Sequence, residues 1–232
     1  MNMLRQLTTA MTLGATLIAA PMITTTVWAA PTAASEQKAT ENLVKQLSGI
    51  KSLTANFEQT TKVNNAKATQ KKALNAQHMN QTFTGVMKVA RPGKFSWDIT
   101  GPTKQKIVTS GKTVWIYDPD LQQAVRQSLD EQVSNTPALL LSGNTNQIRD
   151  AYRVTQPDQT KTYYTLYPKK NDGVFQSLTI SFGTNKAPNL MVLADSLGQT
   201  TYVRFTNVKV NPSIADSTFN FTPPKGTDII DQ

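Results

Sequence analysis

The sequence contains no cysteine and a single histidine, His78. A chain without cysteine can form no disulfide framework, has no thiol nucleophile, and lacks the acylated amino-terminal cysteine that would anchor it to a membrane. Because His78 has no second histidine and no cysteine to join it, we expect no metal site there.

Sequence motifs that hold nucleotides or catalyse hydrolysis are missing as well. The chain has neither G-x-x-x-x-G-K-[ST] nor G-x-G-x-x-G after a predicted strand, and it has no G-x-S-x-G turn. Asp118 and Asp120 flank a proline and are better explained as turn residues than as a catalytic pair. Asp130 and Glu131 are neighbours along the chain, where side chains usually diverge. We therefore expect neither an enzyme nor a cofactor.

Long uninterrupted hydrophobic runs are also missing. The most apolar region, 11–23, is broken by threonines and a proline and is too short for a spanning helix. Arg5 is the only charged side chain before this region, and a small-residue pattern typical of signal cleavage ends at Ala29. These features predict a signal peptide, 1–29, cleaved after about Ala29, and an exported domain, 30–232.

The chain is strongly basic. Its formal net charge is +9, or +8 once Arg5 is removed, which favours anionic partners such as lipid headgroups or acidic protein faces. Nucleic acid is the least expected anionic partner of an exported chain. The stretch 59–97 contains no acidic residue. Within it, 62–80 is rich in Asn, Gln, Ala and Lys and predicts a basic, mobile loop of a hairpin; a solvated loop is favoured over a dedicated binding arm.

Short alternating segments fill the chain from Phe83 onward, separated by turns of Gly, Pro, Asn and Asp. Such spacing predicts an antiparallel barrel or sandwich and excludes an alternating βαβ fold. Two of these segments, 114–117 and 190–194, are apolar on both faces. Either both faces of the sheet are covered or one lines a cavity, and the few predicted helices offer little to cover a second face.

Leucine-rich segments predict the few helices. Ser35 is a candidate N-cap for an amphipathic helix over 36–47. Thr136 and Pro137 suit the start of one or two short, apolar turns, and a further short helix is predicted at 146–149. The leucines that could cover a cavity from these segments are Leu43, Leu47, Leu139, Leu140 and Leu141.

The hairpin around Pro92-Gly93 carries the most unusual charge. Apolar side chains alternate on both sides of this turn, and Arg91 continues the apolar parity of the first strand. A cation at this place suggests that the face borders something other than a dry core. The apolar residues that could line a cavity here are Met87, Val89, Phe95, Trp97 and Ile99. A diacylated ligand would need about ten kcal/mol or more of shielding from water, which such a face could supply.

Four segments, 91–97, 110–119, 135–137 and 219–226, together resemble the periplasmic outer-membrane lipoprotein carrier (LolA) family, in order and with compatible spacing. The resemblance implies a mainly β fold with a few short helices. More specifically, it implies an incomplete, curved antiparallel β-barrel, or half-barrel, with a helical lid over a hydrophobic cavity. The loop 62–80 is longer and more basic than expected of the family.

The resemblance also implies a function in the periplasm. Members of the family accept lipoproteins released by the inner-membrane ABC exporter LolCDE and deliver them to the outer-membrane acceptor LolB. By this resemblance Arg91 is the latch that holds the lid, Phe95 and Trp97 line the cavity beneath it, and the chain is expected to act as a monomer. Since the sequence offers no nucleotide site, cargo would move down an affinity gradient set by the partners.

Two other functions remain open from the sequence. A periplasmic half-barrel of this kind could instead sense lipid or lipoprotein and regulate a membrane partner, although such sensors usually add a second domain. A lipid hydrolase is a more distant alternative, and LolB itself would need the amino-terminal cysteine that the chain lacks.

Overall fold

The computed structural model describes residues 31–63, 81–110, 112–128, 137–170 and 175–232. The predicted signal peptide lies outside these residues, as do His78, Thr136, the pair at 130–131 and most of the predicted loop at 62–80. Everything below concerns the unit of residues 31–232.

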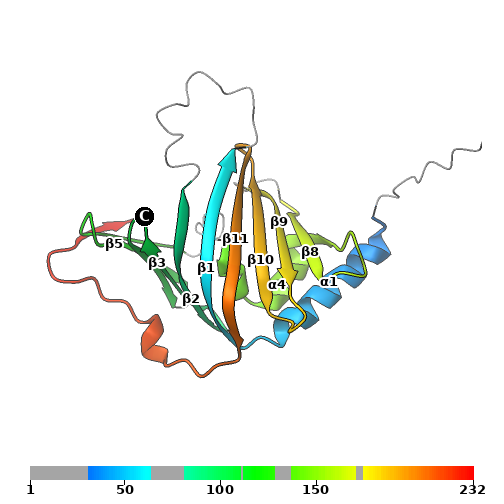
Figure 1. Cartoon of the computed structure of the whole chain (residues 1–232), viewed down its shortest axis with the longest axis horizontal. Coiled ribbons are helices and arrows are strands. Elements are labelled where there is room, and N and C mark those ends of the chain that lie inside the picture. The colour runs from blue at the N-terminus through cyan, green and yellow to red at the C-terminus, as the bar shows by residue number, and fades with distance from the viewer. Residues whose placement is uncertain (1–30, 64–80, 111, 129–136, 171–174) are drawn as a thin grey trace, which may run out of the picture. The chain divides into compact units, whose positions relative to one another are not determined.

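A single open sheet dominates the described part of the chain (Figure 1). Its twelve strands lie in the order β12-β6-β5-β4-β3-β2-β1-β11-β10-β9-β8-β7. In chain order they are β1 (Ser52–Val63), β2 (Thr82–Ala90), β3 (Lys94–Gly101), β4 (Gln105–Ser110), β5 (Thr113–Asp118), β6 (Gln123–Ser128), β7 (Tyr152–Thr155), β8 (Tyr163–Pro168), β9 (Phe175–Phe182), β10 (Pro188–Asp195), β11 (Gln199–Val210) and β12 (Asp228–Asp231). The sheet curves strongly but does not close, which confirms the predicted half-barrel.

Antiparallel pairing follows the meander predicted from the sequence, with one exception. Consecutive strands pair with each other from β1 to β6 and from β7 to β11, and β1 joins these two halves of the sheet by pairing with both β2 and β11. At the edge, β12 pairs with β6 in parallel.

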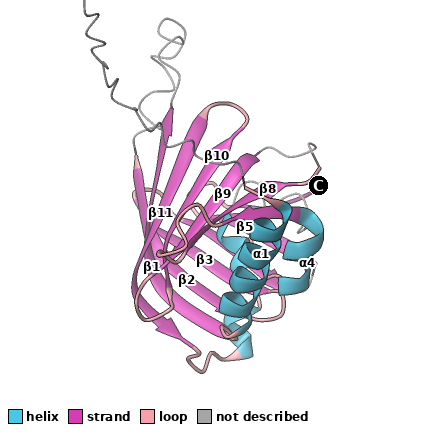
Figure 2. Cartoon of the chain, turned by 90° about the vertical axis from the view of Figure 1, so that its right-hand side faces the viewer, coloured by secondary structure: helices cyan, strands magenta, loops and turns pink. Residues whose placement is uncertain are grey.

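Helix α1 (Ala33–Ser48) packs along β7 and against α4 (Thr145–Ala151). Figure 2 shows the two helices side by side against one face of the sheet. The prediction of Ser35 as N-cap is wrong, because Thr32 Oγ1 accepts a hydrogen bond from the Ser35 backbone N–H at 3.3 Å. The helix therefore begins one turn earlier than expected, since both residues can cap and local sequence did not distinguish them. The predicted short helix at 146–149 is confirmed as α4, capped by Asn144.

The predicted leucine-rich turn is the 3-10 helix η1 (Pro137–Leu141). Ser142 follows its last residue, and the Ser142 backbone N–H donates to the Leu139 carbonyl oxygen at 2.9 Å. The Ser142 hydroxyl donates to the same oxygen at 2.8 Å. These two bonds fix the exit of η1 toward the β2–β3 turn.

The carboxy-terminal segment covers the outer face of β3–β5, which the sequence analysis did not foresee. A 3-10 helix, η2 (Asp216–Phe219), contacts β3 and β4, and its Phe219 is 1 % exposed. Phe221 then packs on Trp115 and Tyr117, with ring centroids 5.8 and 5.4 Å apart. The prolines within 219–226 predict an extended edge segment of the sheet, and this prediction is wrong. The sheet edge is instead β12, and the two-faced strand at 114–117 is explained by this cover.

Candidate functional site

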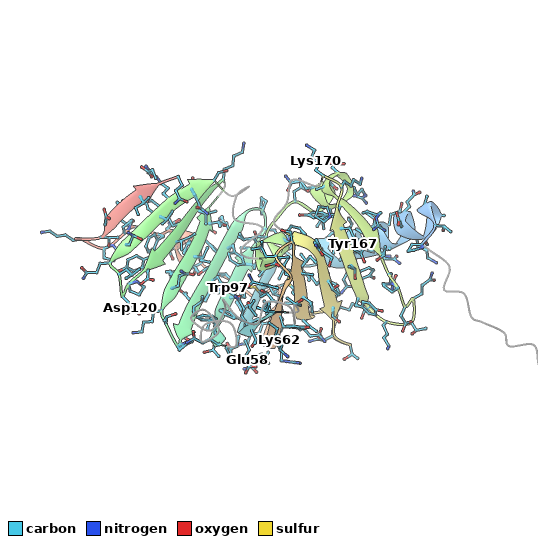
Figure 3. The ribbon with its side chains drawn as sticks, turned by 90° about the horizontal axis from the view of Figure 1, so that it is seen from above. Glu58, Lys62, Trp97, Asp120, Tyr167 and Lys170 are labelled. Carbon is cyan, nitrogen blue, oxygen red and sulfur yellow. The ribbon has the colours of Figure 1, made fainter. Side chains whose placement is uncertain are left out.

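The inner face of the β2–β3 hairpin holds the apolar side chains predicted to line a cavity. Met87 lies opposite Trp97, and Val89 lies opposite Phe95, so the four share one face of the sheet. All four are buried, and Ile99 is partly buried at the far end of β3. Seen from above, Trp97 lies in the middle of the sheet (Figure 3).

An aromatic stack joins this hairpin to β1. The ring of Phe57 lies over that of Trp97 with centroids 3.6 Å apart and planes 15° from parallel, and Phe95 follows at 6.0 Å from Trp97. Gly85, opposite Phe57, makes this possible. A Cβ atom at Gly85 would lie 2.5 Å from the Phe57 ring and 2.0 Å from the carbonyl oxygen of Asp98.

Leucines of α1 and η1 close the inner face. Leu43 and Leu47 from α1 and Leu139 and Leu141 from η1 belong to the same buried cluster as the hairpin residues, and Leu140 packs against that cluster while partly exposed. Side chains of the sheet and of the helices thus form one buried apolar cluster. Five predicted leucines and five predicted lining residues are brought together, on opposite sides of one apolar interior.

Arg91 lies where the β2–β3 turn meets η1. Its Nε donates to the Leu141 carbonyl oxygen at 2.8 Å. Two residues on, the Gly93 backbone N–H donates to the Ser142 carbonyl oxygen at 2.9 Å. The Arg91 backbone N–H itself donates to the Lys51 carbonyl oxygen at 2.8 Å, and this bond fixes the turn to the start of β1. One side-chain and one backbone hydrogen bond therefore connect the hairpin to η1 and to the residue that follows it.

Burial of the Arg91 guanidinium has an electrostatic cost. Burial lowers its pKa from the ordinary value of an arginine to about 10, because desolvation disfavours the charged form. Its Nη2 atom is buried and has no hydrogen-bond partner. A hydrogen bond from a charged donor typically contributes about 1.5–3 kcal/mol, and the desolvation opposes it. The cost of burying the charge therefore offsets part of what the hydrogen bond between Arg91 and η1 contributes.

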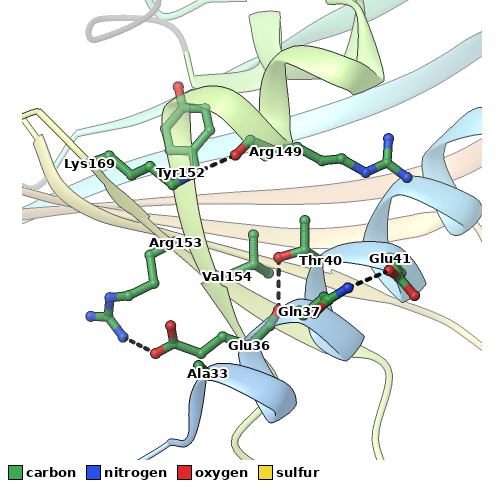
Figure 4. Close-up of a pocket in the computed structure, with 10 residues that line it drawn as sticks. All are labelled: Ala33, Glu36, Gln37, Thr40, Glu41, Arg149, Tyr152, Arg153, Val154 and Lys169. Atoms are coloured by element: carbon green, nitrogen blue, oxygen red, sulfur yellow. Dashed lines mark hydrogen bonds and ion pairs between the residues drawn. The ribbon is translucent and has the colours of Figure 1, made fainter.

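A groove of about 530 Å³ lies elsewhere, between the first half of α1 and β7 (Figure 4). Arg153 crosses it to pair with Glu36 at 2.8 Å, and Lys169 donates to the Arg149 carbonyl oxygen at 2.7 Å. No pattern in the sequence predicts this groove. Its lining combines charged and polar groups with apolar surface. The residues that line it are Ala33, Glu36, Gln37, Thr40, Glu41, Arg149, Tyr152, Arg153, Val154 and Lys169.

In the part of the chain that the structure describes, no helix is both long and apolar enough to cross a membrane. No group of three or more His, Cys, Asp or Glu side chains there could hold a metal ion.

Known proteins with similar sequences point to one family. The family model described as outer membrane lipoprotein carrier protein LolA matches residues 48–222. An outer-membrane lipoprotein carrier protein of Hahella chejuensis is 41 % identical over 187 residues, which cover 79 % of this chain and 84 % of that protein. One of Pseudomonas fluorescens is 40 % identical over 202 residues, covering 87 % of this chain and 92 % of that protein.

Solved structures agree on the fold. An uncharacterized conserved protein from Thermus thermophilus superposes with a TM-score of 0.50 at 10 % identity, covering 84 % of this chain and 99 % of that one. At this identity the likeness concerns the fold alone. The match to the family model and to these relatives, together with the open curved sheet, leads to one conclusion: this chain belongs to the outer-membrane lipoprotein carrier (LolA) family.

Proposed function

We propose that this protein binds the acyl chains of lipoproteins in the periplasm and carries them to the outer membrane. The observation that carries the proposal is the closed apolar interior, bounded by the sheet and by leucines of two helices and held by Arg91 at Leu141. An apolar interior beneath a weakly held cover is what a reversible carrier of acyl chains requires.

Opening of η1 is the step that would admit cargo. The hydrogen bond from Arg91 to Leu141 and that from Gly93 to Ser142 would break, and Leu139 and Leu141 would leave the cluster. The side chains that then become accessible are Met87, Val89, Phe95 and Trp97. Burial of each acyl methylene contributes about 0.8 kcal/mol, so one long chain offsets the loss of a few lid contacts.

Release would run the same steps in reverse. The empty protein regains its lid contacts and the bond at Arg91, so the free energy of closing favours delivery. This explains how a protein with no apparent energy source could hand cargo onward, provided that an acceptor binds the acyl chains more tightly.

The finer assignments follow the family resemblance. The donor would be the inner-membrane exporter LolCDE, the acceptor LolB, and the carrier a monomer cleaved after about Ala29. The basic loop at 62–80 would face anionic membrane or an acidic partner surface. In this function the chain does no chemistry of its own.

The direct test incubates the purified mature protein with inner-membrane vesicles containing the exporter and a lipoprotein. On addition of ATP, lipoprotein should appear in the soluble fraction as an equimolar complex. If lipoprotein stays in the membrane pellet while a carrier of known activity releases it, the proposal is wrong.

A further inference from the structure

Two buried side-chain nitrogens in the described part of the chain have no hydrogen-bond partner: Arg91 Nη2 and Gln127 Nε2. Arg91 already has a contact with η1 through its Nε atom. Gln127 makes none of the contacts that connect the hairpin to η1, and only 7 % of this residue is exposed. Burying an amide N–H without a partner costs stability, so native proteins rarely tolerate it without a reason.

The register of the sheet places Gln127 on the inner face. Val89 pairs with Phe95, Phe95 with Thr109, Thr109 with Val114, and Val114 with Gln127. Residues directly opposite one another on antiparallel strands share a face, so Gln127 lies in one row with the apolar lining. The preceding residue on β6 supports this placement, because Arg126 lies over Trp115 on the outer face and consecutive residues of a strand face opposite sides.

This row lies near the end of the sheet that η1 covers. The Thr109 hydroxyl donates to the Gly93 carbonyl oxygen at 3.0 Å, and the Gly93 N–H donates to the residue after η1. Three strand intervals of about 4.8 Å separate β3 from β6, so Gln127 lies about 14 Å across the sheet from Phe95. At this distance across the sheet from the β2–β3 hairpin, Gln127 cannot take part in the hydrogen bond between Arg91 and η1.

We propose that Gln127 recognises the acyl linkage of the cargo, by donating a hydrogen bond from Nε2 to an ester or amide carbonyl oxygen. This inference rests on the proposed function. An acyl chain is by definition attached through a carbonyl, and the carbonyl lies at the end of the chain that would stay nearest the opening left by η1. A donor left unpaired in the empty protein is satisfied once such an oxygen arrives. The interior thereby distinguishes acyl chains from plain hydrocarbon chains of equal length.

The test compares two soluble lipopeptides that differ only in their linkage. One carries two ester-linked palmitoyl chains on glycerol, and the other carries two ether-linked hexadecyl chains. Binding to the mature protein is followed by competition with a fluorescent lipopeptide. The unaltered protein should prefer the ester probe by about 3- to 10-fold, the value of one net hydrogen bond. Gln127→Met should bind the ether probe as the unaltered protein does and lose the preference.

The stability of the empty protein gives a second readout, because the expected change has the opposite sign to that of an ordinary structural glutamine. Since methionine leaves no buried donor unpaired, Gln127→Met should raise the denaturation midpoint of the empty protein, whereas a purely structural glutamine would lower it when replaced. Gln127→Leu serves as a second apolar variant if the first folds poorly. Gln105→Met is the matched control, because Gln105 faces the same side of the sheet, opposite Ile99, at the other end of β4 from Thr109. It should keep the ester preference.

The outcomes separate the two proposals. Equal binding of both probes by the unaltered protein, or an ester preference that survives in Gln127→Met, overturns the role of Gln127 and leaves the carrier function standing. If neither probe binds the unaltered protein, the carrier function itself is refuted, and the role of Gln127 with it.

Discussion

Replacement of Arg91 by leucine should make the carrier retain its cargo. In the closed, empty form the charged hydrogen bond to Leu141 contributes about 1.5–3 kcal/mol, and an unpaired Leu141 carbonyl oxygen would add about 1 kcal/mol to the cost of losing it. Relief of the desolvation that lowers the pKa of Arg91 to about 10 works in the opposite direction. Because the side chain keeps partial solvent access, we discount that relief to about 1–2 kcal/mol. The closed form should lose about 1–2 kcal/mol in total.

The substitution should slow the release of cargo and leave its uptake unchanged. If the empty, closed state is less stable by that amount, cargo is retained about 5- to 30-fold more tightly. The assay loads a fluorescent lipopeptide and follows its transfer to acceptor vesicles over time. Arg91→Leu should load normally and transfer slowly. The control is Arg153→Leu, which removes an arginine paired with Glu36 in the groove between α1 and β7, and it should behave as the unaltered protein. Transfer by Arg91→Leu at the normal rate would show that Arg91 does not hold the lid.

Three further predictions concern stability. Gly85→Ala should lower the free energy of unfolding by about 1–3 kcal/mol in urea titration, because its Cβ has no room beside the Phe57 ring; an unchanged midpoint would contradict the packing described here. Phe219→Ala should cost about 3–5 kcal/mol in the same titration, since this buried ring anchors the carboxy-terminal segment; a loss below 1 kcal/mol would show that the anchor is not needed. The hydrogen bond from Arg126 lowers the pKa of Asp231, so its stabilising effect is present at neutral pH and is lost as the pH falls through that lowered pKa. Asp231→Asn should flatten the acid limb of the stability profile, and an identical limb would exclude this pair as its source.

The sequence was sufficient to predict the hairpin at the centre of the structure. Alternation with period two on both sides of Pro92-Gly93 placed Phe95 and Trp97 on one face, and the parity of Arg91 placed its charge beside them. The antiparallel register then brings these residues together as expected. Local pattern succeeded here because the turn directly joins the two strands.

Contacts between distant segments could not be predicted in this way. Phe57 lies over Trp97 only because β1 pairs with β2 across a long connection, and nothing in either segment encodes that register alone. The cover of the outer face by Phe219 and Phe221 depends likewise on a segment that returns to the sheet after β11. Gln127 was missed for another reason: a glutamine on a short strand usually faces solvent, and only the burial of its partner row showed otherwise.

Fluorescence of Trp97 tests the central claim most directly. Trp115 is on the outer face against Phe221, and the third tryptophan of the chain, Trp28, belongs to the predicted signal peptide. The mature Trp115→Phe variant therefore reports on Trp97 alone, and Trp97→Phe reports on Trp115. A lipopeptide with brominated acyl chains should quench Trp97 on binding and leave Trp115 unchanged. Binding without quenching of Trp97, or equal quenching of both, would contradict an interior that opens to hold acyl chains.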